Sequence, residues 1–262
     1  MTTKVFAAGG YRYIPAVSQY SAGVAAEPGF RIERARFASV VPIAAGFERI
    51  EAYLRSIGRP PAAFCACELR SPEPFTEEGF RAFNAVYVTT LRRWGIMSGD
   101  ADNPVARSNV CPELDPPPEP GFYAFSYTVP ADSEAAGHGT GTSEGGFVVA
   151  GSAESAEGKG DYRDNTIAYG DTSPEGLRRK ARWVLDEMAR RMSALGFQWK
   201  DATAAQVYTV HDIHPFVGHE LVARGAMRGG LTWHFVRPPV QGLEYEMDCR
   251  AVAVERVLPA AP

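Results

Sequence analysis

Residues 173–196, SPEGLRRKARWVLDEMARRMSALG, form the clearest structural signal in the sequence. Ser173 can cap a helix, Pro174 fits its first position, and Glu175 favours the positive end of the helix dipole. Gly196 then supplies a typical helix end. Between these signals apolar side chains recur at spacings of three and four, which predicts an amphipathic helix over 174–195: Leu177, Ala181, Val184, Met188, Met192 and Leu195.

The elements around this helix repeat an order already present in the first half of the chain. Each half contains strands, a helix that ends in glycine, a strand, a second helix, a strand, a proline-rich loop and a closing strand. In the first half we expect helices over 43–57 and from Thr76 to near Gly95, and strands over 63–69, 105–111 and 122–129. In the second half we expect a strand over 204–210, a helix over 215–224 and strands over 231–237 and 243–254.

The segment between the halves has the composition of a linker. Residues 131–146 are rich in Ser, Gly, Thr and Ala, and a strand-like stretch over 146–151 restarts the pattern. An internal duplication accounts for 262 residues better than one large domain does. We therefore predict two similar domains, residues 1–133 and 134–262.

The composition excludes several classes of protein. With 45% hydrophobic and 22% charged residues the chain is neither disordered nor collagen-like. The net charge of -4 provides no basic field, so we expect no nucleic-acid partner and no membrane partner. The sequence shows neither a long apolar run nor a secretory signal, which predicts a cytoplasmic protein. We expect all four cysteines to be reduced thiols: Cys65, Cys67, Cys111 and Cys249.

Short segments in both halves match the motifs of one known family. Ser18-Gln19-Tyr20-Ser21 is similar to a Pro-Tyr-Ser turn, Phe83-Asn84-Ala85-Val86-Tyr87 to a Phe-x-x-x-Asn-x-x-Tyr helix, and Pro104-Val105-Ala106-Arg107-Ser108 to a Pro-Ala-Arg-Ser strand with one residue inserted. Residues 146–151 resemble an early strand, and 243–248 resemble a closing Val-Glu-Ile-Glu strand. These motifs belong to the RidA family of reactive intermediate deaminases, and the chain resembles a tandem duplication of that domain.

The resemblance implies a fold, an assembly and an activity. It implies an α+β protein of two RidA-like domains, each a mixed β-sheet with two helices packed on one face, and a barrel-like trimer with sites between subunits. Family members hydrolyse enamines and imines, commonly 2-aminoacrylate-type acids, to a keto acid and ammonia, with no cofactor. By motif, Arg107 would pair with the substrate carboxylate and Glu246 would position water. A more distant similarity connects the chain with chorismatases, which also resemble duplicated RidA-like domains.

Each half keeps only one part of this implied site. The second half has Gly230 where the arginine should be, and the first half has residues 122–125 where the glutamate should be. A complete site therefore needs Arg107 from one half and Glu246 from another. We accordingly expect a homotrimer or a multiple of three chains.

Five residues are candidates for substrate binding. The planar guanidinium of Arg107 can hold a carboxylate at two points, although a surface salt bridge is the alternative. Tyr20 could stack on a conjugated substrate and Asn84 could contact it, but packing or a loop hydrogen bond would explain both equally well. His234 on a predicted strand could line a pocket. Arg237 could bind substrate or could instead bridge to an acidic pair.

That acidic pair is the candidate for catalysis. Glu246 and Asp248 are two residues apart on a predicted strand and so share one face, where close carboxylates raise one another's pKa. One could hold a proton for acid catalysis while the other orients water. His211 and His214 suggest a metal site, but this spacing on a strand does not place both imidazoles on one face, and no third ligand is identifiable. We predict no metal ligands and no cofactor.

The leading hypothesis is a hydrolytic deaminase. It would act on the enamine or imine form of a small unsaturated amino acid, such as a 2-aminoacrylate- or 2-aminomuconate-like carboxylate, and release ammonia. Two alternatives stay open, a chorismatase-like enol-ether hydrolase and a non-catalytic module that binds a metabolite. Ammonia release, pyruvate release from chorismate, and binding without turnover would distinguish the three.

Overall fold

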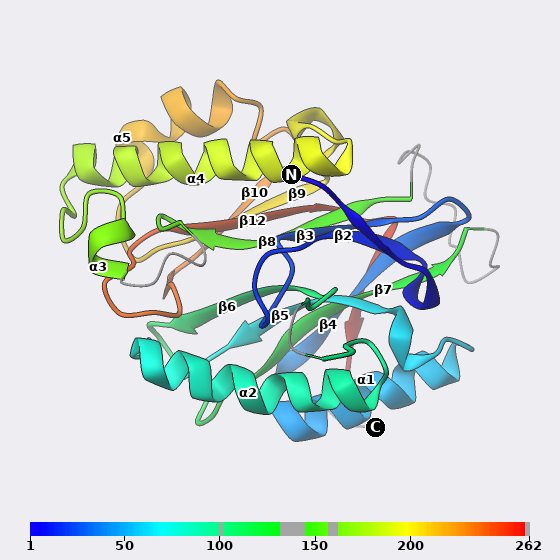
Figure 1. Ribbon diagram of the computed structural model, residues 1–262. Coiled ribbons are helices and arrows are strands. Elements are labelled where there is room, and N and C mark those ends of the chain that lie inside the picture. Colours follow the sequence, from blue (N-terminus) through cyan, green and yellow to red (C-terminus); the bar gives the residue numbers. More distant parts are fainter. Residues whose placement is uncertain (100–101, 132–144, 157–161, 260–262) are drawn as a thin grey trace.

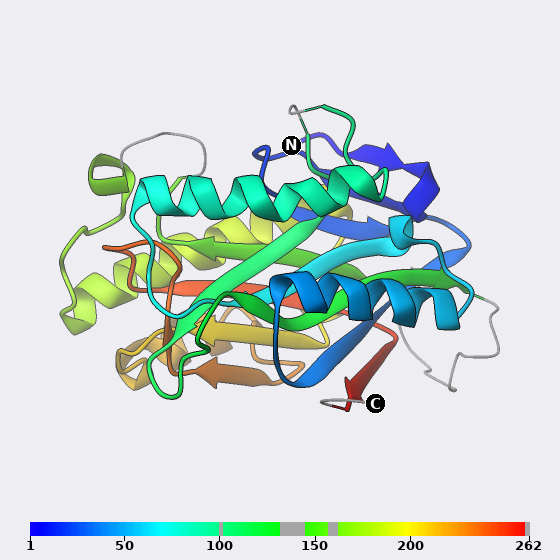
Figure 2. The ribbon, with the colours of Figure 1, turned by 90° about the horizontal axis from the view of Figure 1, so that it is seen from below.

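The computed structural model describes residues 1–99, 102–131, 145–156 and 162–259, in which two β-sheets face each other between outer layers of helices (Figure 1). α4 (Pro174–Leu195) and α5 (His214–Phe216) cover one sheet. α1 (Ile43–Ser56) and α2 (Glu77–Arg93) lie across the outer face of the other, as Figure 2 shows from below. α3 (Tyr162–Asn165) is a single turn. In the ranges given above, no helix is long and apolar enough to cross a membrane.

Both sheets are mixed. The seven-stranded sheet has the order β1 (Lys4–Phe6), β2 (Tyr11–Ile14), β3 (Gly23–Ala26), β8 (Phe147–Ala153), β12 (Glu246–Ala251), β9 (Ala204–Tyr208), β10 (Leu231–His234). The six-stranded sheet has the order β11 (Val236–Arg237), β6 (Ala106–Pro112), β5 (Phe64–Arg70), β7 (Gly121–Pro130), β4 (Phe30–Pro42), β13 (Val254–Leu258). Three strand pairs are parallel, namely β5 with β6, β9 with β10 and β4 with β13.

One topology occurs twice in the chain. In the first half, β4, α1, β5, α2, β6 and β7 form a sheet in the order β6-β5-β7-β4. In the second half, β8, α4, β9, α5, β10 and β12 form a sheet in the order β10-β9-β12-β8. In both, one parallel pair is followed by two antiparallel pairs. The predicted fold class, α+β with two RidA-like units, is confirmed.

The two units exchange strands. β3 pairs with β8 and thereby joins β1 to β3 to the sheet of the second half. In return β13 pairs with β4, and β11 pairs with β6, in the sheet of the first half. Each sheet is therefore completed by strands from the other half of the chain.

The predicted boundary between residues 133 and 134 falls within residues 132–144, outside the described ranges, and it stays a prediction.

The residues predicted to begin and end helices form the expected caps in the structure. Ser173 Oγ accepts a hydrogen bond from the backbone N–H of Gly176, and Gly196 adopts a left-handed conformation with φ of 93° at the end of α4. Thr76 caps α2 in the same way. The apolar face of α4 packs on the seven-stranded sheet, and a second core lies between α1, α2 and the six-stranded sheet.

Three predicted elements in the second half differ from the structure. The strand expected over 231–237 is divided at the half-exposed Phe235 into β10 and β11, which belong to different sheets. The strand expected over 243–254 begins only at Glu246, because side chains bind the backbone of residues 244 and 245 and keep them out of the ladder. The helix expected over 215–224 has one α-helical turn followed by a π-helical stretch, Val217–Val222.

Candidate active site

Arg107 and Glu246 line the same pocket within a single chain. Arg107 comes from β6 in one unit and Glu246 from the start of β12 in the other. The remaining walls are formed by Tyr20, by Phe80 of α2, by the end of β8 and the residues after it, and by apolar residues between 239 and 243. The pocket holds about 510 Å³, including its open mouth. Arg107 and Glu246, which lie in different halves of the sequence, thus line one pocket without a second subunit.

Arg107 lies in an aromatic enclosure with its donors free. Its guanidinium carbon is 5.0 Å from the ring centre of Tyr87 and 5.1 Å from that of Tyr20, and it also contacts the rings of Phe80 and Phe83. The side chain is buried, yet neither Nη1 nor Nη2 has a hydrogen-bond partner among the described residues. Rings hold the cation by cation–π contact and leave its edges for a ligand. A carboxylate is the ligand that such a planar fork fits best.

Glu246 faces the pocket as a buried carboxyl group. Burial raises its pKa well above the usual range, and the negative charges of Asp248 and Glu154 raise it further. Gly151 on β8 leaves the space that this carboxyl occupies, because a Cβ there would collide with Glu246 Oε1. The raised pKa favours the neutral form of the carboxyl group, whose proton can be given to a bound molecule.

A fully buried ion pair fixes the segment that leads into Glu246. Lys180 of α4 donates to Glu154 Oε1 at 3.0 Å, and neither side chain is exposed to solvent. The Glu154 carboxylate also accepts the backbone N–H groups of Glu244 at 2.7 Å and Tyr245 at 3.1 Å. Because these are the two residues before β12, the pair sets the position from which Glu246 enters the pocket.

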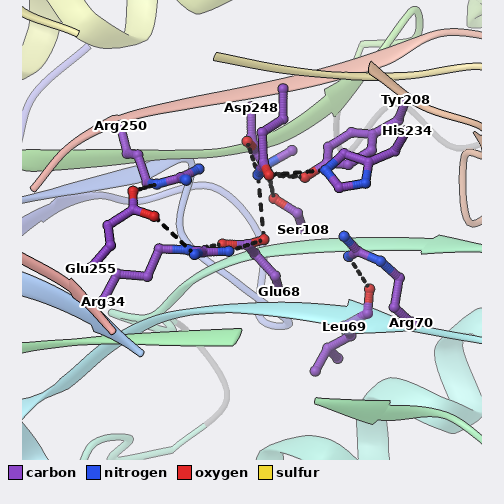
Figure 3. Close-up of polar contacts among 12 residues, drawn as sticks. Arg34, Glu68, Leu69, Arg70, Ser108, Tyr208, His234, Asp248, Arg250 and Glu255 are labelled. Atoms are coloured by element: carbon purple, nitrogen blue, oxygen red, sulfur yellow. Dashed lines mark hydrogen bonds and ion pairs between the residues drawn. The ribbon is translucent and has the colours of Figure 1, made fainter. Parts of the chain in front are cut away.

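Asp248, the second predicted catalytic carboxylate, has a different environment. It points between the sheets and accepts hydrogen bonds from Ser108 Oγ at 2.6 Å, Gln206 Nε2 at 2.8 Å and Tyr208 Oη at 2.7 Å (Figure 3). Burial and the charge of Glu68 raise its pKa. Glu246 and Asp248 share a face of β12 as predicted, but Asp248 belongs to this interior network rather than to the pocket wall.

The other predicted binding residues lie in several places. Tyr20 lines the pocket. His234 joins the interior network through Gln206, with Nε2 3.1 Å from Oε1, and burial lowers its pKa to about 4. Asn84 is buried in α2, where its amide atoms have no partner in the part of the chain that is described. Arg237 forms a surface ion pair with Glu113 at 2.7 Å, which is one of the bridges that arginines at the surface commonly make.

The two histidines considered for a metal each bind a separate carboxylate. His211 Nε2 lies 2.7 Å from Glu244 Oε2, and His214 Nδ1 lies 2.6 Å from Asp212 Oδ1. Within the described ranges no three His, Cys, Asp or Glu side chains are grouped as metal ligands.

Sequence reasoning missed two residues that line the pocket, Asn109 and Gly151, and two that support it from behind, Glu154 and Lys180. Asn109 follows Arg107 by two positions on one strand, and this spacing alone could have identified it. Gly151, Glu154 and Lys180 carry no such signal, since their roles arise only when β8, α4 and β12 pack together.

The repeated unit has the RidA-like topology that the sequence motifs predicted, and the pocket lies between its two copies. The chain belongs to the family described as 2-aminomuconate deaminase CnbZ, whose family model matches residues 3–256. It is 54% identical over 254 residues to the 2-amino-5-chloromuconate deaminase of Comamonas testosteroni, covering 97% of this chain and 98% of that one. The protein is therefore an enzyme of the deaminase class.

Two solved structures of low sequence identity are similar to this chain, and the first of them shares its fold. A crystal structure of a chorismatase superposes with a TM-score of 0.52 at 14% identity, covering 88% of this chain and 77% of that one. The YjgF gene product of E. coli covers 41% of this chain and 80% of its own, with 16% identity and a TM-score of 0.30.

Proposed function

We propose that this enzyme hydrolyses 2-aminomuconate or a halogenated aminomuconate to the 2-oxo acid and ammonia. One observation supports the proposal above all others: a buried guanidinium, whose Nη1 and Nη2 have no partner among the described residues, and a buried carboxyl group with a raised pKa line the same pocket. The names of its family and of its relative in Comamonas testosteroni agree with this substrate class.

The proposed reaction begins with binding of the substrate carboxylate. Arg107 holds the carboxylate next to the amine at two points, and the surrounding rings pack against the flat conjugated chain. Because Arg107 is buried, bulk water is kept away from its guanidinium, which strengthens the attraction between this cation and the substrate carboxylate. The amine-bearing carbon then lies over the site that Glu246 faces.

Glu246 donates and accepts the protons that the hydrolysis requires. The Glu246 carboxyl group protonates the enamine carbon, which gives an iminium ion and leaves Glu246 as a carboxylate. Water then adds to the C=N carbon while this carboxylate takes up the proton that the water loses. The resulting carbinolamine loses its C–N bond as the neutral carboxyl protonates the leaving nitrogen. The Glu246 carboxylate that remains takes the hydroxyl proton as the C=O bond forms, so substrate plus water gives the 2-oxo acid and ammonia, and Glu246 returns to its neutral form.

The test is ammonia release from 2-aminomuconate generated immediately before the assay. The purified chain is expected to accelerate release over the buffer rate, and chorismate serves as the comparison substrate. Binding of aminomuconate with no acceleration would contradict the proposal and favour a binding module. Pyruvate release from chorismate would favour the enol-ether hydrolase.

Assembly and location are further parts of the proposal. A homotrimer or a multiple of three chains is supported by the RidA resemblance, and light scattering at micromolar concentration tests it, with a strict monomer as the contradicting result. A cytoplasmic location is supported by the four cysteines, all buried and free. Cell fractionation tests this location.

A further inference from the structure

A second donor without a partner lines the pocket beside Arg107. Asn109 is 3% exposed, and its Oδ1 accepts a hydrogen bond from Ser71 Oγ at 3.0 Å. This bond fixes the plane of the amide. Its Nδ2 is left with no hydrogen-bond partner among the residues that the structure describes. A buried N–H group without an acceptor costs free energy unless a ligand supplies one.

Arg107 and Asn109 lie side by side along one wall of the pocket, because both come from β6. Residues two apart on a strand point to the same side, and their Cα atoms lie about 7 Å apart. Both Arg107 and Asn109 line the pocket from β6. The wall formed by Pro239, Val240 and Leu243 is apolar and offers no charge or side-chain donor to an anion.

We propose that Asn109 binds the second carboxylate of a dicarboxylate substrate, while Arg107 binds the carboxylate beside the amine. This inference rests on the proposed deaminase function and adds a basis for substrate choice. A six-carbon dianion extends from one donor to the other and satisfies both. A monocarboxylate leaves Nδ2 buried without an acceptor, and sites built to bind a polar group reject analogues that lack it.

The experiment compares two substrates in the intact enzyme and in Asn109→Asp. The substrates are 2-aminomuconate, a dicarboxylate, and 2-aminoacrylate, a monocarboxylate, each generated in the assay. Asn109→Asp keeps the shape but replaces the donor by a carboxylate, which repels the second carboxylate of the substrate. We expect kcat/KM for 2-aminomuconate to fall roughly 10- to 100-fold, the range for one hydrogen bond to a charged group. For 2-aminoacrylate, which has no second carboxylate, we expect a clearly smaller loss.

Two further variants keep the test decisive. Asn109→Ala removes the donor without adding charge and should give the same selective loss, which covers the case in which Asn109→Asp does not fold. Ser71→Ala leaves the donor but releases the amide plane, and it should produce a smaller loss of the same selectivity. Thermal melts of each variant show that the fold is retained.

The outcomes separate this inference from the function on which it rests. An equal loss for both substrates, or no loss for either, would overturn the role of Asn109 and leave the deaminase function standing. A wild-type preference for 2-aminoacrylate would overturn the inference as well. If the wild-type enzyme deaminated neither substrate, the proposed function itself would fail.

Discussion

The two acidic residues of β12 lie in regions of opposite character. Asp248 accepts three side-chain hydrogen bonds in the network between the sheets, a region that also holds the Arg34–Glu68 ion pair at 2.6 Å. Glu246, two residues earlier, faces a pocket, and in the described ranges no side chain donates a hydrogen bond to its carboxyl group. Both groups are buried, and burial raises the pKa of both.

The comparison teaches that burial alone does not identify a catalytic carboxylate. A group whose acceptors are occupied stabilises the fold, because its partners compensate for the loss of hydration. A group that is buried, protonated and open to a pocket is available for proton transfer. The same distinction separates Arg34, paired with Glu68, from Arg107 with its free donors.

The largest expected effect comes from Glu246→Gln compared with Asp248→Asn. The first removes the acidic proton but keeps the shape, so the rate of ammonia release should fall by roughly 10² to 10⁴ with the fold intact. The second weakens a satisfied network and should lower the free energy of unfolding by about 1–3 kcal/mol. Steady-state kinetics and urea unfolding measure the two. A folded Asp248→Asn enzyme as slow as Glu246→Gln would assign the proton transfer to Asp248 instead.

Lys180→Met should have the next largest effect, on stability. Removing one partner of a fully buried pair leaves the Glu154 carboxylate uncompensated, which costs about 3–5 kcal/mol in unfolding free energy. Denaturant unfolding measures this cost. The matched control adds Glu154→Gln, which removes the leftover charge and should recover part of the loss. A Lys180→Met protein of wild-type stability would show that the pair does not hold the segment before β12.

Arg107→Lys tests whether the free donors bind substrate at two points. A lysine ammonium keeps the charge but not the planar fork, so kcat/KM should fall roughly 10- to 100-fold. Arg55→Lys is the control, because Arg55 is exposed and forms its ion pair with Glu51 one turn away. Unchanged kinetics in Arg107→Lys would remove the carboxylate-binding role from this residue.

Gly151→Ala changes the position of the Glu246 carboxyl group and leaves the carboxyl group itself in place. The added methyl group meets the end of the Glu246 side chain, which must move, and a small misplacement of a catalytic group lowers kcat by roughly 10- to 100-fold. Gly218→Ala is the control, since a Cβ there meets no neighbour. Full activity in Gly151→Ala would mean that the carboxyl position is not critical.

The pH dependence of stability is the smallest of the expected effects when it is expressed per pH unit. Since the pKa of Glu246 is raised in the folded state, the unfolded chain ionises first as pH rises above the ordinary glutamate value. The free energy of unfolding should therefore fall with rising pH by at most about 1.4 kcal/mol per pH unit up to the raised pKa. Glu246→Gln removes this contribution, so the difference between the two proteins, followed by urea unfolding from pH 4 to 8, isolates it. Parallel curves would contradict a protonated Glu246.

Local signals in the sequence predicted the helices and the repeated unit. Ser173 and Thr76 begin helices and Gly196 ends one, each through hydrogen bonds within a few residues, so the neighbouring sequence contains the whole cause. The motifs likewise identified Arg107 and Glu246, which now line one pocket. The trimer and the catalytic roles stay predictions.

The exchange of strands and the Lys180–Glu154 ion pair that fixes the segment before β12 depend on contacts between residues far apart in the sequence. Nothing within 231–237 indicates that the run divides between two sheets, because each part is decided by its partner strand, β9 or β6. Glu154 and Lys180 are separated by 26 residues and meet only after α4 has packed on β8. Such pairs leave no periodic pattern in the sequence.

The exchange of strands also bears on how the protein is made. The six-stranded sheet receives its edge strand from Val254–Leu258, and Arg256 of that strand donates to Glu33, 223 residues earlier. During translation the β4 edge is complete long before the ribosome releases its partner. An unpaired edge can pair with other chains. The six-stranded sheet, which begins with β4, therefore stays without its edge strand until β13 has been synthesised, so its completion has to wait for chain from the second half.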